Sequence, residues 1–315
     1  MDDLKALEHF YTNDLRGPLS RLERRRKQIL WKSLLLALGL TVANVLVFLV
    51  MEGNEKSLAA FTTVGSLVWL AYFALSEDAR WANDFKTTVI PRLLNRIEPS
   101  LAYSPEGKIE SRMFDATCLY EFSQMFDYDG EDLVTGMLGG VPVSFCELRV
   151  TSGSSRSGRK TRFRGMFLVA EVDVGINDPV WLLPQDYVNM RDKFGPVSHL
   201  LSGVLNRMSQ RSGEEFELDD SEFMDLYSVV AEDGQTAARL LTKDLRGKLI
   251  DLRRCFGGEV RVSFQPNQIA VALSTEGGHF EPRLTKSVLS NDVARRFAED
   301  VSHALRIVIA IQPMS

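Results

Sequence analysis

Cysteine is scarce in this chain, with three residues among 315: Cys118, Cys146 and Cys255. The number is odd, the spacing is wide, and no two of them form a CxxC pair. These features exclude a disulfide framework and a cysteine-based zinc site. We therefore expect three buried, reduced thiols, which is the usual state of cysteine in a reducing compartment.

The familiar signatures of catalysis are also missing. The four histidines, His9, His199, His279 and His303, lie far apart and form no HExxH motif. Neither a GxSxG nucleophile elbow nor a GxGxxG turn after a strand occurs. The sequence therefore predicts no catalytic residue, no cofactor and no metal ligand, and it favours a binding role over an enzymatic one.

A cleavable signal peptide is not expected, because the first 28 residues are charged and lack a short apolar stretch. Two uncharged runs of 19 residues follow instead, Ser33–Met51 and Leu58–Ser76. At ~1.5 Å per residue, each would span about 28 Å as a helix, close to the ~30 Å hydrocarbon core of a bilayer. The sequence predicts a transmembrane hairpin with helices at about 30–51 and 58–76.

The polar turn Glu52–Ser57 is so short that the two helices must be antiparallel, with both chain ends on one side. Eleven basic residues flank the hairpin on that side, and the turn contains only Lys56. The positive-inside rule then predicts a multi-pass protein of the cell inner membrane with cytoplasmic termini. Trp31, Trp69, Tyr72 and Trp81 are expected near the interfaces. The flanking basic residues are Arg16, Arg21, Arg24, Arg25, Arg26, Lys27, Lys32, Arg80, Lys86, Arg92 and Arg96.

The run Arg24–Lys27 could also be interpreted as a nucleic-acid patch. Beside a membrane span, its expected role is to fix the topology and to attract anionic lipid, at roughly 1 kcal/mol per basic residue. We therefore predict no nucleic-acid partner.

The rest of the chain predicts an α+β fold of mostly antiparallel strands with amphipathic helices. The N-terminal part, 1–96, ends in a juxtamembrane helix, and 97–315 forms a cytoplasmic domain with a possible division into two subdomains near 192–213. The clearest hairpin joins Leu133–Leu138 to Val141–Val150 over Gly139 and Gly140. Pro142 suggests that the second of these strands is at an edge where it begins. Further strands are predicted at Phe163–Val174, Val180–Leu183, Leu226–Ala231, Glu259–Phe264 and Gln268–Leu273.

Three helices are predicted after the first strands. They cover Val197–Met208, Gln235–Phe256, which Gly257 and Gly258 end, and Asn291–Ile311. The acidic stretch Glu214–Asp225 between them is expected to be a solvated loop.

The segments Phe85–Ile90, Ser144–Glu147 and Arg239–Thr242, with several other short motifs, resemble the domain of unknown function 3137 family, over roughly Trp31 to Pro282. Members are bacterial membrane proteins with two N-terminal spans and a soluble region of this kind, so the resemblance implies the same architecture. It implies no activity. One motif departs from the family, because Cys146 follows Phe145 where a serine is usual. The motifs are Phe85–Ile90, Leu101–Pro105, Tyr128–Asp132 with Gly136, Ser144–Glu147, Arg239–Thr242, Val262–Phe264 and Phe280–Pro282.

A basic segment is the main candidate site. Gly153–Thr161 approaches a phosphate-binding P-loop, but Arg159 stands where lysine is needed and a strand rather than a helix follows. The second interpretation is a flexible basic loop, Ser152–Thr161, that binds anionic head groups or an acidic protein partner. A solvated loop without a ligand is the third. The residues of the possible anionic-ligand loop are Arg156, Arg159, Lys160, Arg162 and Arg164.

Carboxylates provide the alternative chemistry. Asp127–Asp132 begins like a calcium loop, but Leu138 occupies the position of the required glutamate, so a capped turn is expected. Glu147 and Glu171 could pair for acid–base work, with Glu147 on the face of Val143 and Phe145.

The sequence thus favours a membrane-anchored cytoplasmic interaction domain that binds anionic lipid or a protein partner. One alternative is an enzyme on a membrane-borne or phosphorylated substrate, using Asp129, Glu131, Asp132 or Glu147. Another is an accessory subunit whose spans pack against a second membrane protein through small and polar residues. The oligomeric state is left open.

Overall fold

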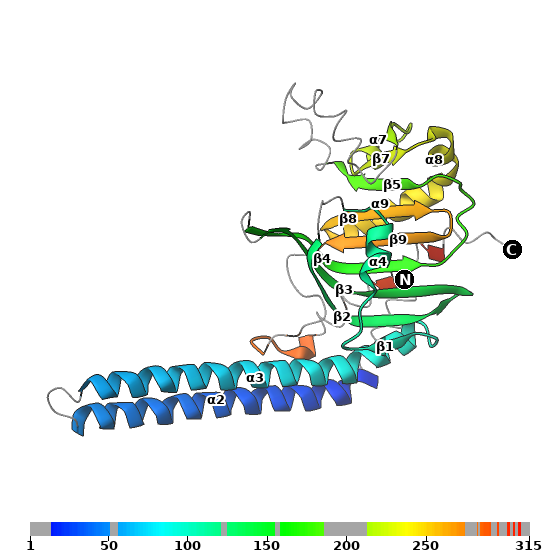
Figure 1. Cartoon of the computed structure of the whole chain (residues 1–315). Coiled ribbons are helices and arrows are strands. Elements are labelled where there is room, and N and C mark those ends of the chain that lie inside the picture. The colour runs from blue at the N-terminus through cyan, green and yellow to red at the C-terminus, as the bar shows by residue number, and fades with distance from the viewer. Residues whose placement is uncertain are drawn as a thin grey trace. The chain divides into compact units, whose positions relative to one another are not determined.

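The structure is a computed structural model, and it describes residues 14–50, 56–120, 125–154, 158–185, 213–274, 282, 284–290, 295, 301–302, 305 and 308–309 (Figure 1). The chain divides into two compact units. The first comprises Met1–Leu93 and Phe280–Arg295, and the second comprises Leu94–His279 and Arg296–Ser315. The predicted helix Val197–Met208 lies outside the described residues.

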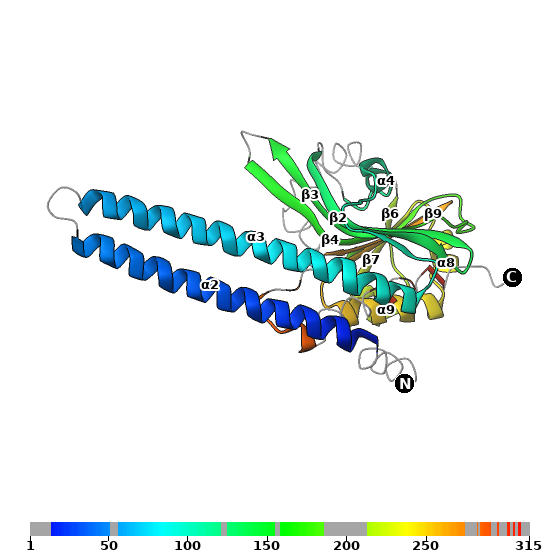
Figure 2. The ribbon, with the colours of Figure 1, turned by 90° about the horizontal axis from the view of Figure 1, so that it is seen from below.

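Two long helices, α2 (Arg16–Val50) and α3 (Lys56–Ile97), dominate the first unit. They run antiparallel and side by side in both views (Figures 1 and 2). Within the described part of the chain, α2 is the one helix that passes as long and apolar enough to cross a membrane. A membrane-spanning pair therefore remains a prediction, and a single candidate span is what the structure supports.

The N-terminal half of α2 packs against α3 in the manner of a soluble protein. The side chains of Leu19, Leu22 and Trp81 are buried. The Trp81 indole Nε1 donates to the Leu22 carbonyl at 3.1 Å. Arg25 forms an exposed ion pair with Asp84. The Trp81 ring is fully buried and its N–H bonds to the backbone of α2, so this side chain contacts protein, and its position near a membrane interface stays a prediction.

Farther along the helix pair, toward Val50 and Lys56, the distribution of polar and apolar side chains is reversed. Leu38, Leu49 and Phe61 are more than half exposed, at 61, 71 and 76%. The Asn44 amide instead contacts α3, where its Nδ2 donates to Ser66 Oγ and its Oδ1 accepts from Thr62 Oγ1, both at 3.2 Å. Apolar side chains thus face outward while polar groups bond between the helices.

A C-terminal segment returns to α2. It includes the 3-10 helix η3 (Val288–Ser290). Arg26 Nη1 donates to the Leu284 carbonyl at 2.7 Å, and the Glu23 carboxylate accepts from the Val288 N–H at 3.3 Å. A 2.7 Å ion pair with Arg26, together with this backbone bond, holds the pKa of the buried Glu23 below its usual value.

The second unit is built on one sheet. Among the described residues, nine strands are joined in the order β1-β2-β3-β4-β9-β8-β5-β7-β6, and every neighbouring pair is antiparallel. The predicted mixed fold with an antiparallel sheet is confirmed. The strands are β1 (Ala102–Ser104), β2 (Met125–Leu138), β3 (Val141–Ser154), β4 (Gly158–Ala170), β5 (Val180–Pro184), β6 (Glu214–Phe216), β7 (Tyr227–Ala231), β8 (Glu259–Gln265) and β9 (Gln268–Ser274).

Helices cover both faces of this sheet, as the two ribbon views show (Figures 1 and 2). On one face lies α4 (Ser111–Ala116), whose Phe114 joins a buried aromatic cluster with Phe163 and Phe167. On the other lie α8 (Gly234–Leu240) and α9 (Lys243–Phe256). The Tyr227 hydroxyl of β7 donates to the Leu249 carbonyl of α9 at 3.1 Å.

One predicted helix, Gln235–Phe256, is in fact two. The chain leaves the helical conformation at Leu241, and the Thr242 hydroxyl accepts from the Leu245 N–H at 3.3 Å, which caps a new helix. A threonine that satisfies a free backbone donor favours such a restart over continuation. Ala238 of α8 is exposed as a result, although its spacing from Leu241 and Leu245 would place all three on one face of a continuous helix. Gly257 ends α9 in the left-handed conformation as predicted, with φ at 66°.

Other local predictions are in part confirmed and in part corrected by the structure. The turn of Gly139 and Gly140 is confirmed, with φ of 56° and 87°. The acidic stretch Glu214–Asp225 is not a loop throughout, since it contains β6 and α7 (Ser221–Met224), the latter capped by Asp220. β3 lies between β2 and β4 along most of its length, and it is at an edge only where it begins, as Pro142 suggested. Pro142 is tolerated because it precedes the first β4 pair, Val143 with Ala170.

Candidate functional site

The basic segment is a β-hairpin, and the prediction of a flexible loop over Ser152–Thr161 was wrong. β3 continues to Ser154 and β4 begins at Gly158, with Ser152 opposite Lys160 and Gly153 opposite Arg159. Gly153 allows this close pairing, because a Cβ there would lie 2.2 Å from the Gly158 carbonyl oxygen. Its β4 part, from Gly158 to Arg162, is exposed, whereas Ser152 on β3 is buried, and cross-strand pairing holds both parts extended. Arg156 lies outside the described residues.

The hairpin extends beyond the strand beside it (Figure 1). The pairing of β4 with β9 begins at Gly165 opposite Ser274, so the part of β4 before Gly165 pairs only with β3 among the described residues. That part carries four exposed cationic side chains. They are Arg159, Lys160, Arg162 and Arg164. The structure therefore brings together every described member of the predicted anionic-ligand set.

The register divides these cations between two faces. Arg164 lies directly opposite the exposed Arg149 of β3, and directly opposed residues share a face. Arg159 is on the same face by alternation along β3. Ser152 lies opposite Lys160 and shares its face. A bulge at Arg162 lets its Nε donate to Ser152 Oγ, so Arg162 lies on that face as well. The hairpin therefore presents positive charge on both sides.

This charge is little compensated. Residues 141–170 contain six basic residues and a single acid, Glu147. Asp129 of β2 lies opposite Arg149, and its carboxylate is 3.9 Å from the Lys108 ammonium. In the part of the chain that the structure describes, no ion pair reaches Lys160 or Arg164. Two arginines opposite each other repel, and that arrangement favours an anionic ligand.

Three of the acidic candidates, Asp129, Glu131 and Asp132, belong to β2, so the turn predicted at Asp127–Asp132 was wrong, although Asp129 does accept from the Gly130 N–H at 2.9 Å. Asp132 is fully buried at a bulge with φ of 63°, and its carboxylate accepts from the Tyr103 hydroxyl. Burial, and then this bond to a carboxylate, raise the pKa of Tyr103. Glu131 lies opposite Glu147, which is 7% exposed.

The proposed pairing of Glu147 with Glu171 does not occur. Glu147 is opposite Met166, and Glu171 lies five residues farther along, roughly 17 Å at ~3.4 Å per residue. Within the described ranges, no three histidine, cysteine or acidic side chains gather as metal ligands.

The cysteines do not share one environment. Cys146 is fully buried among aromatic residues, and its Sγ accepts from the Ile109 N–H at 3.3 Å. Burial raises the pKa of the Cys146 thiol to about 12. Cys118 is half-exposed, which corrects the expectation of three buried thiols. The side chain of Cys255 is outside the described set.

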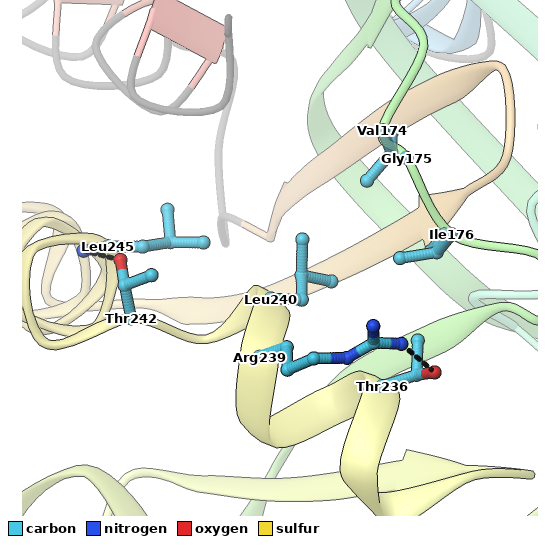
Figure 3. A pocket seen from close by; sticks show the side chains of 8 residues that line it. All are labelled: Val174, Gly175, Ile176, Thr236, Arg239, Leu240, Thr242 and Leu245. Carbon is cyan, nitrogen blue, oxygen red and sulfur yellow. Dashed lines mark hydrogen bonds between the residues drawn. The ribbon is translucent and has the colours of Figure 1, made fainter.

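A pocket that sequence reasoning missed lies between α8, the start of α9 and the segment after β4 (Figure 3). Its volume is about 270 Å³. The lining residues are Val174, Gly175, Ile176, Thr236, Arg239, Leu240, Thr242 and Leu245. Three of them, Arg239, Leu240 and Thr242, belong to one of the motifs quoted above. The motif was the available signal, and it was overlooked because a continuous helix was predicted there.

A short chain of hydrogen bonds orients the pocket's arginine. Asp233 caps α8 by accepting from the backbone N–H groups of Gln235 and Thr236 at 3.0 Å. It also accepts from Thr236 Oγ1 at 2.6 Å, and Thr236 Oγ1 accepts from Arg239 Nη2 at 3.2 Å (Figure 3). The bond from the Thr236 hydroxyl, followed by those from the backbone, lowers the pKa of Asp233.

A second hollow, of about 440 Å³, follows the α2–α3 pair. It is lined by aliphatic and aromatic residues together with Thr41, Asn44, Thr63 and Ser66. Asn44 and Ser66 bond to each other, and the hydroxyl of Thr41 donates to the Ala37 carbonyl. The polar groups of this groove are thus occupied within the helix pair.

Comparison with known proteins confirms the resemblance to a family. Residues 161–312 match the model described as "Protein of unknown function (DUF3137)". This span includes the motifs from Arg239 onward and extends past Pro282, whereas the motifs before residue 161 lie outside it. No curated protein sequence matches the chain.

One solved structure is similar at a low level, the mycobacterial trehalose monomycolate transport factor A, TtfA. The likeness covers 70% of this chain and 96% of that one, with 14% identity and a TM-score of 0.31. A TM-score this low indicates neither a shared fold nor a shared function.

Proposed function

We propose that this chain, whose residues 161–312 match the family described as Protein of unknown function (DUF3137), is a membrane-anchored binding protein. In this proposal, α2 and α3 cross the inner membrane with both chain ends in the cytoplasm. The β3–β4 hairpin binds phosphate-bearing lipid head groups of the adjacent leaflet.

The reversed polarity of the helix pair carries the proposal. Leu38, Leu49 and Phe61 face outward, while Asn44 hydrogen-bonds across to α3. In water this arrangement would be unfavourable, since each exposed apolar side chain costs roughly 1.5–3 kcal/mol relative to burial. In a bilayer it is favourable, because lipid solvates the apolar surface and interhelical hydrogen bonds satisfy the polar groups.

The position of the reversal supports the topology. The part of the pair with ordinary packing contains Trp81, and its outer surface carries the ion pair Arg25–Asp84. Water must reach that surface, so it belongs outside the bilayer. It is also the end where basic residues concentrate, which favours the cytoplasmic side.

The hairpin supports the choice of ligand. Arg149 and Arg164 lie opposite each other, and like charges in that position destabilise a sheet. A phosphate group between them would remove the repulsion and accept hydrogen bonds from both guanidinium groups. Tethering to an anionic leaflet keeps such groups at high local concentration.

Thiol labelling in intact bacterial cells tests the topology. We expect a membrane-impermeant maleimide to label Asn54→Cys, because the turn between the helices would lie outside. The matched variant Gln28→Cys should be labelled only after permeabilisation. The unchanged chain provides the blank, since its three cysteines all follow the second predicted span. Labelling of Gln28→Cys alone would reverse the proposed orientation. Protection of both sites, with release of the chain by alkaline carbonate, would exclude a membrane-spanning hairpin.

Lipid binding by the hairpin has a separate test. The full chain in neutral-lipid nanodiscs would be titrated with anionic and neutral vesicles over a salt series. Changing Arg159, Lys160, Arg162 and Arg164 together to glutamine is expected to weaken binding to anionic vesicles roughly 100-fold. This is less than four full contributions of ~1 kcal/mol, because the cations occupy two faces and cannot all reach one surface.

The control removes the same charge elsewhere. Arg112, Lys243 and Arg254 are exposed and Lys248 is partly exposed, all on other elements, and the four would be changed together to glutamine. This variant should bind anionic vesicles nearly as well as the unchanged chain, and the affinity of the unchanged chain should fall as salt rises. Equal weakening by both variants would show a dependence on net charge alone and would rule out the hairpin as the site.

A further inference from the structure

We propose that the pocket between α8, α9 and the segment after β4 binds an oxyanion carried on a short apolar chain, with Arg239 as its counter-charge. The group bound is a carboxylate or a phosphate monoester. This site is separate from the basic hairpin and uses none of its residues.

The polar groups of the pocket are suited to an acceptor. No aspartate or glutamate is among its lining residues. Arg239 contributes a guanidinium with five N–H donors, and one of its nitrogens bonds to Thr236. The Thr242 oxygen accepts from the Leu245 N–H, which leaves its hydroxyl proton available to a ligand. Donors without acceptors select a carboxylate or phosphate over a neutral alcohol or an amine.

The remaining walls are apolar. Val174 and Ile176 line one side of the pocket, and Leu240 and Leu245 line the other (Figure 3). Four aliphatic side chains around one guanidinium would place a hydrocarbon group beside the anion. At about 270 Å³ the pocket lies just below the ~300–1,000 Å³ typical of small-molecule sites, so the chain enclosed must be short.

The arginine is held in place without a direct ion pair to a described carboxylate. The Thr236 hydroxyl gives its proton to Asp233 and therefore offers a lone pair to Arg239. The guanidinium thus bonds to a neutral oxygen, and none of the described carboxylates forms an ion pair with it. An oriented cation that lacks a direct counter-ion binds an anion with little reorganisation.

Two different molecules could supply this chemistry. One is a soluble short-chain carboxylate or alkyl phosphate, and the other is the phosphate end of a membrane lipid. Both place an oxyanion next to a few methylene groups. The experiment below includes an arm that tells them apart.

The test titrates the full chain, in neutral-lipid nanodiscs, with sodium hexanoate and hexyl phosphate and measures binding by saturation-transfer NMR. Empty nanodiscs correct for partition into lipid. Hexanol and acetate are the matched probes, since each lacks one half of the proposed ligand. We expect hexanoate and hexyl phosphate to bind about tenfold more tightly than either, because a charge-assisted hydrogen bond adds to the apolar contact.

Arg239→Gln separates the charge from the fold. The side chain is exposed and glutamine is a good helix former, so α8 should be retained. Hexanoate affinity should fall about tenfold to that of hexanol, while hexanol affinity stays the same. Arg112→Gln, which removes an exposed arginine from α4, should change neither.

The last arm adds anionic lipid to the nanodiscs. This arm uses the chain that carries the four hairpin substitutions. If the anionic lipid displaces hexanoate, the ligand is a lipid phosphate. Persistence of hexanoate binding would identify a soluble anion. The proposal is overturned if hexanoate and hexanol bind the unchanged chain equally, or if Arg239→Gln binds hexanoate as well as the unchanged chain does.

Discussion

Phe114→Ala is expected to lower the free energy of unfolding of the sheet unit by about 4 kcal/mol. Phe114 is 2% exposed, and its ring lies 5.0 Å from that of Phe167 and 5.9 Å from that of Phe163. Truncation would leave a cavity and remove these aromatic contacts. It would also release α4, because a six-residue helix without a side-chain N-cap bond has little stability of its own.

The measurement is equilibrium unfolding in urea of the full chain in neutral nanodiscs, combined with hydrogen exchange of the peptide that contains α4. Phe114→Leu is the control, and it should cost less than about 1.5 kcal/mol because most of the volume is kept. Phe163 belongs to the same cluster and stands between Arg162 and Arg164. Phe114→Ala should therefore also loosen the base of the hairpin. A loss below about 1 kcal/mol for alanine would contradict the packing described for α4.

Gly165→Ala is expected to destabilise the same unit by at least about 3 kcal/mol. Gly165 has φ of 150°, and an added Cβ would lie 1.9 Å from the Leu273 carbonyl oxygen. That oxygen belongs to the backbone of β9, so it cannot move aside without opening the β4–β9 ladder. Because this ladder begins at Gly165, the variant should also weaken anionic-vesicle binding by the hairpin beyond it.

Gly247→Ala, made in the otherwise unchanged chain, is expected to increase the free energy of unfolding. Gly247 lies within α9, and an added Cβ would meet nothing within 4 Å. Alanine should stabilise the helix by roughly 0.5–1 kcal/mol. Urea unfolding of the two variants side by side checks both predictions. Equal stability of Gly165→Ala and the unchanged chain would contradict the close approach of β4 to β9.

Sequence patterns predicted the elements whose cause is local. Gly139 and Gly140 accept the positive φ that a two-residue turn requires, so the hairpin around them was predictable. Gly257 ended a helix for the same reason. The break between α8 and α9 was missed because the spacing of Leu241, Leu245 and Leu249 continues across it. Only the cap made by Thr242, which competes with that spacing, interrupts the helix.

The candidate sites show the same division. The cations of β4 were identified from composition alone. The backbone conformation of the segment that carries them was predicted wrongly, because a polar segment can be a loop or an exposed strand. The pairing of Ser152 with Lys160 decides for the strand, and it belongs to the β3–β4 ladder that also pairs Val143 with Ala170. The motif Arg239–Thr242 was a signal for one wall of the pocket, but the pocket as a whole also needs Ile176, which is more than 60 residues away in the chain.

The sequence by itself determined the long apolar helix, the antiparallel strands and the excess of positive charge in one hairpin, because these depend on residue type and local spacing. Tertiary structure alone decided that Arg149 faces Arg164, that Asp129 and Glu131 lie in a strand, and that Arg239 lines a pocket. Each of these depends on which distant segment supplies the neighbour. Local preferences fix the backbone conformation of a segment, whereas its partner is chosen by the packing of the whole unit.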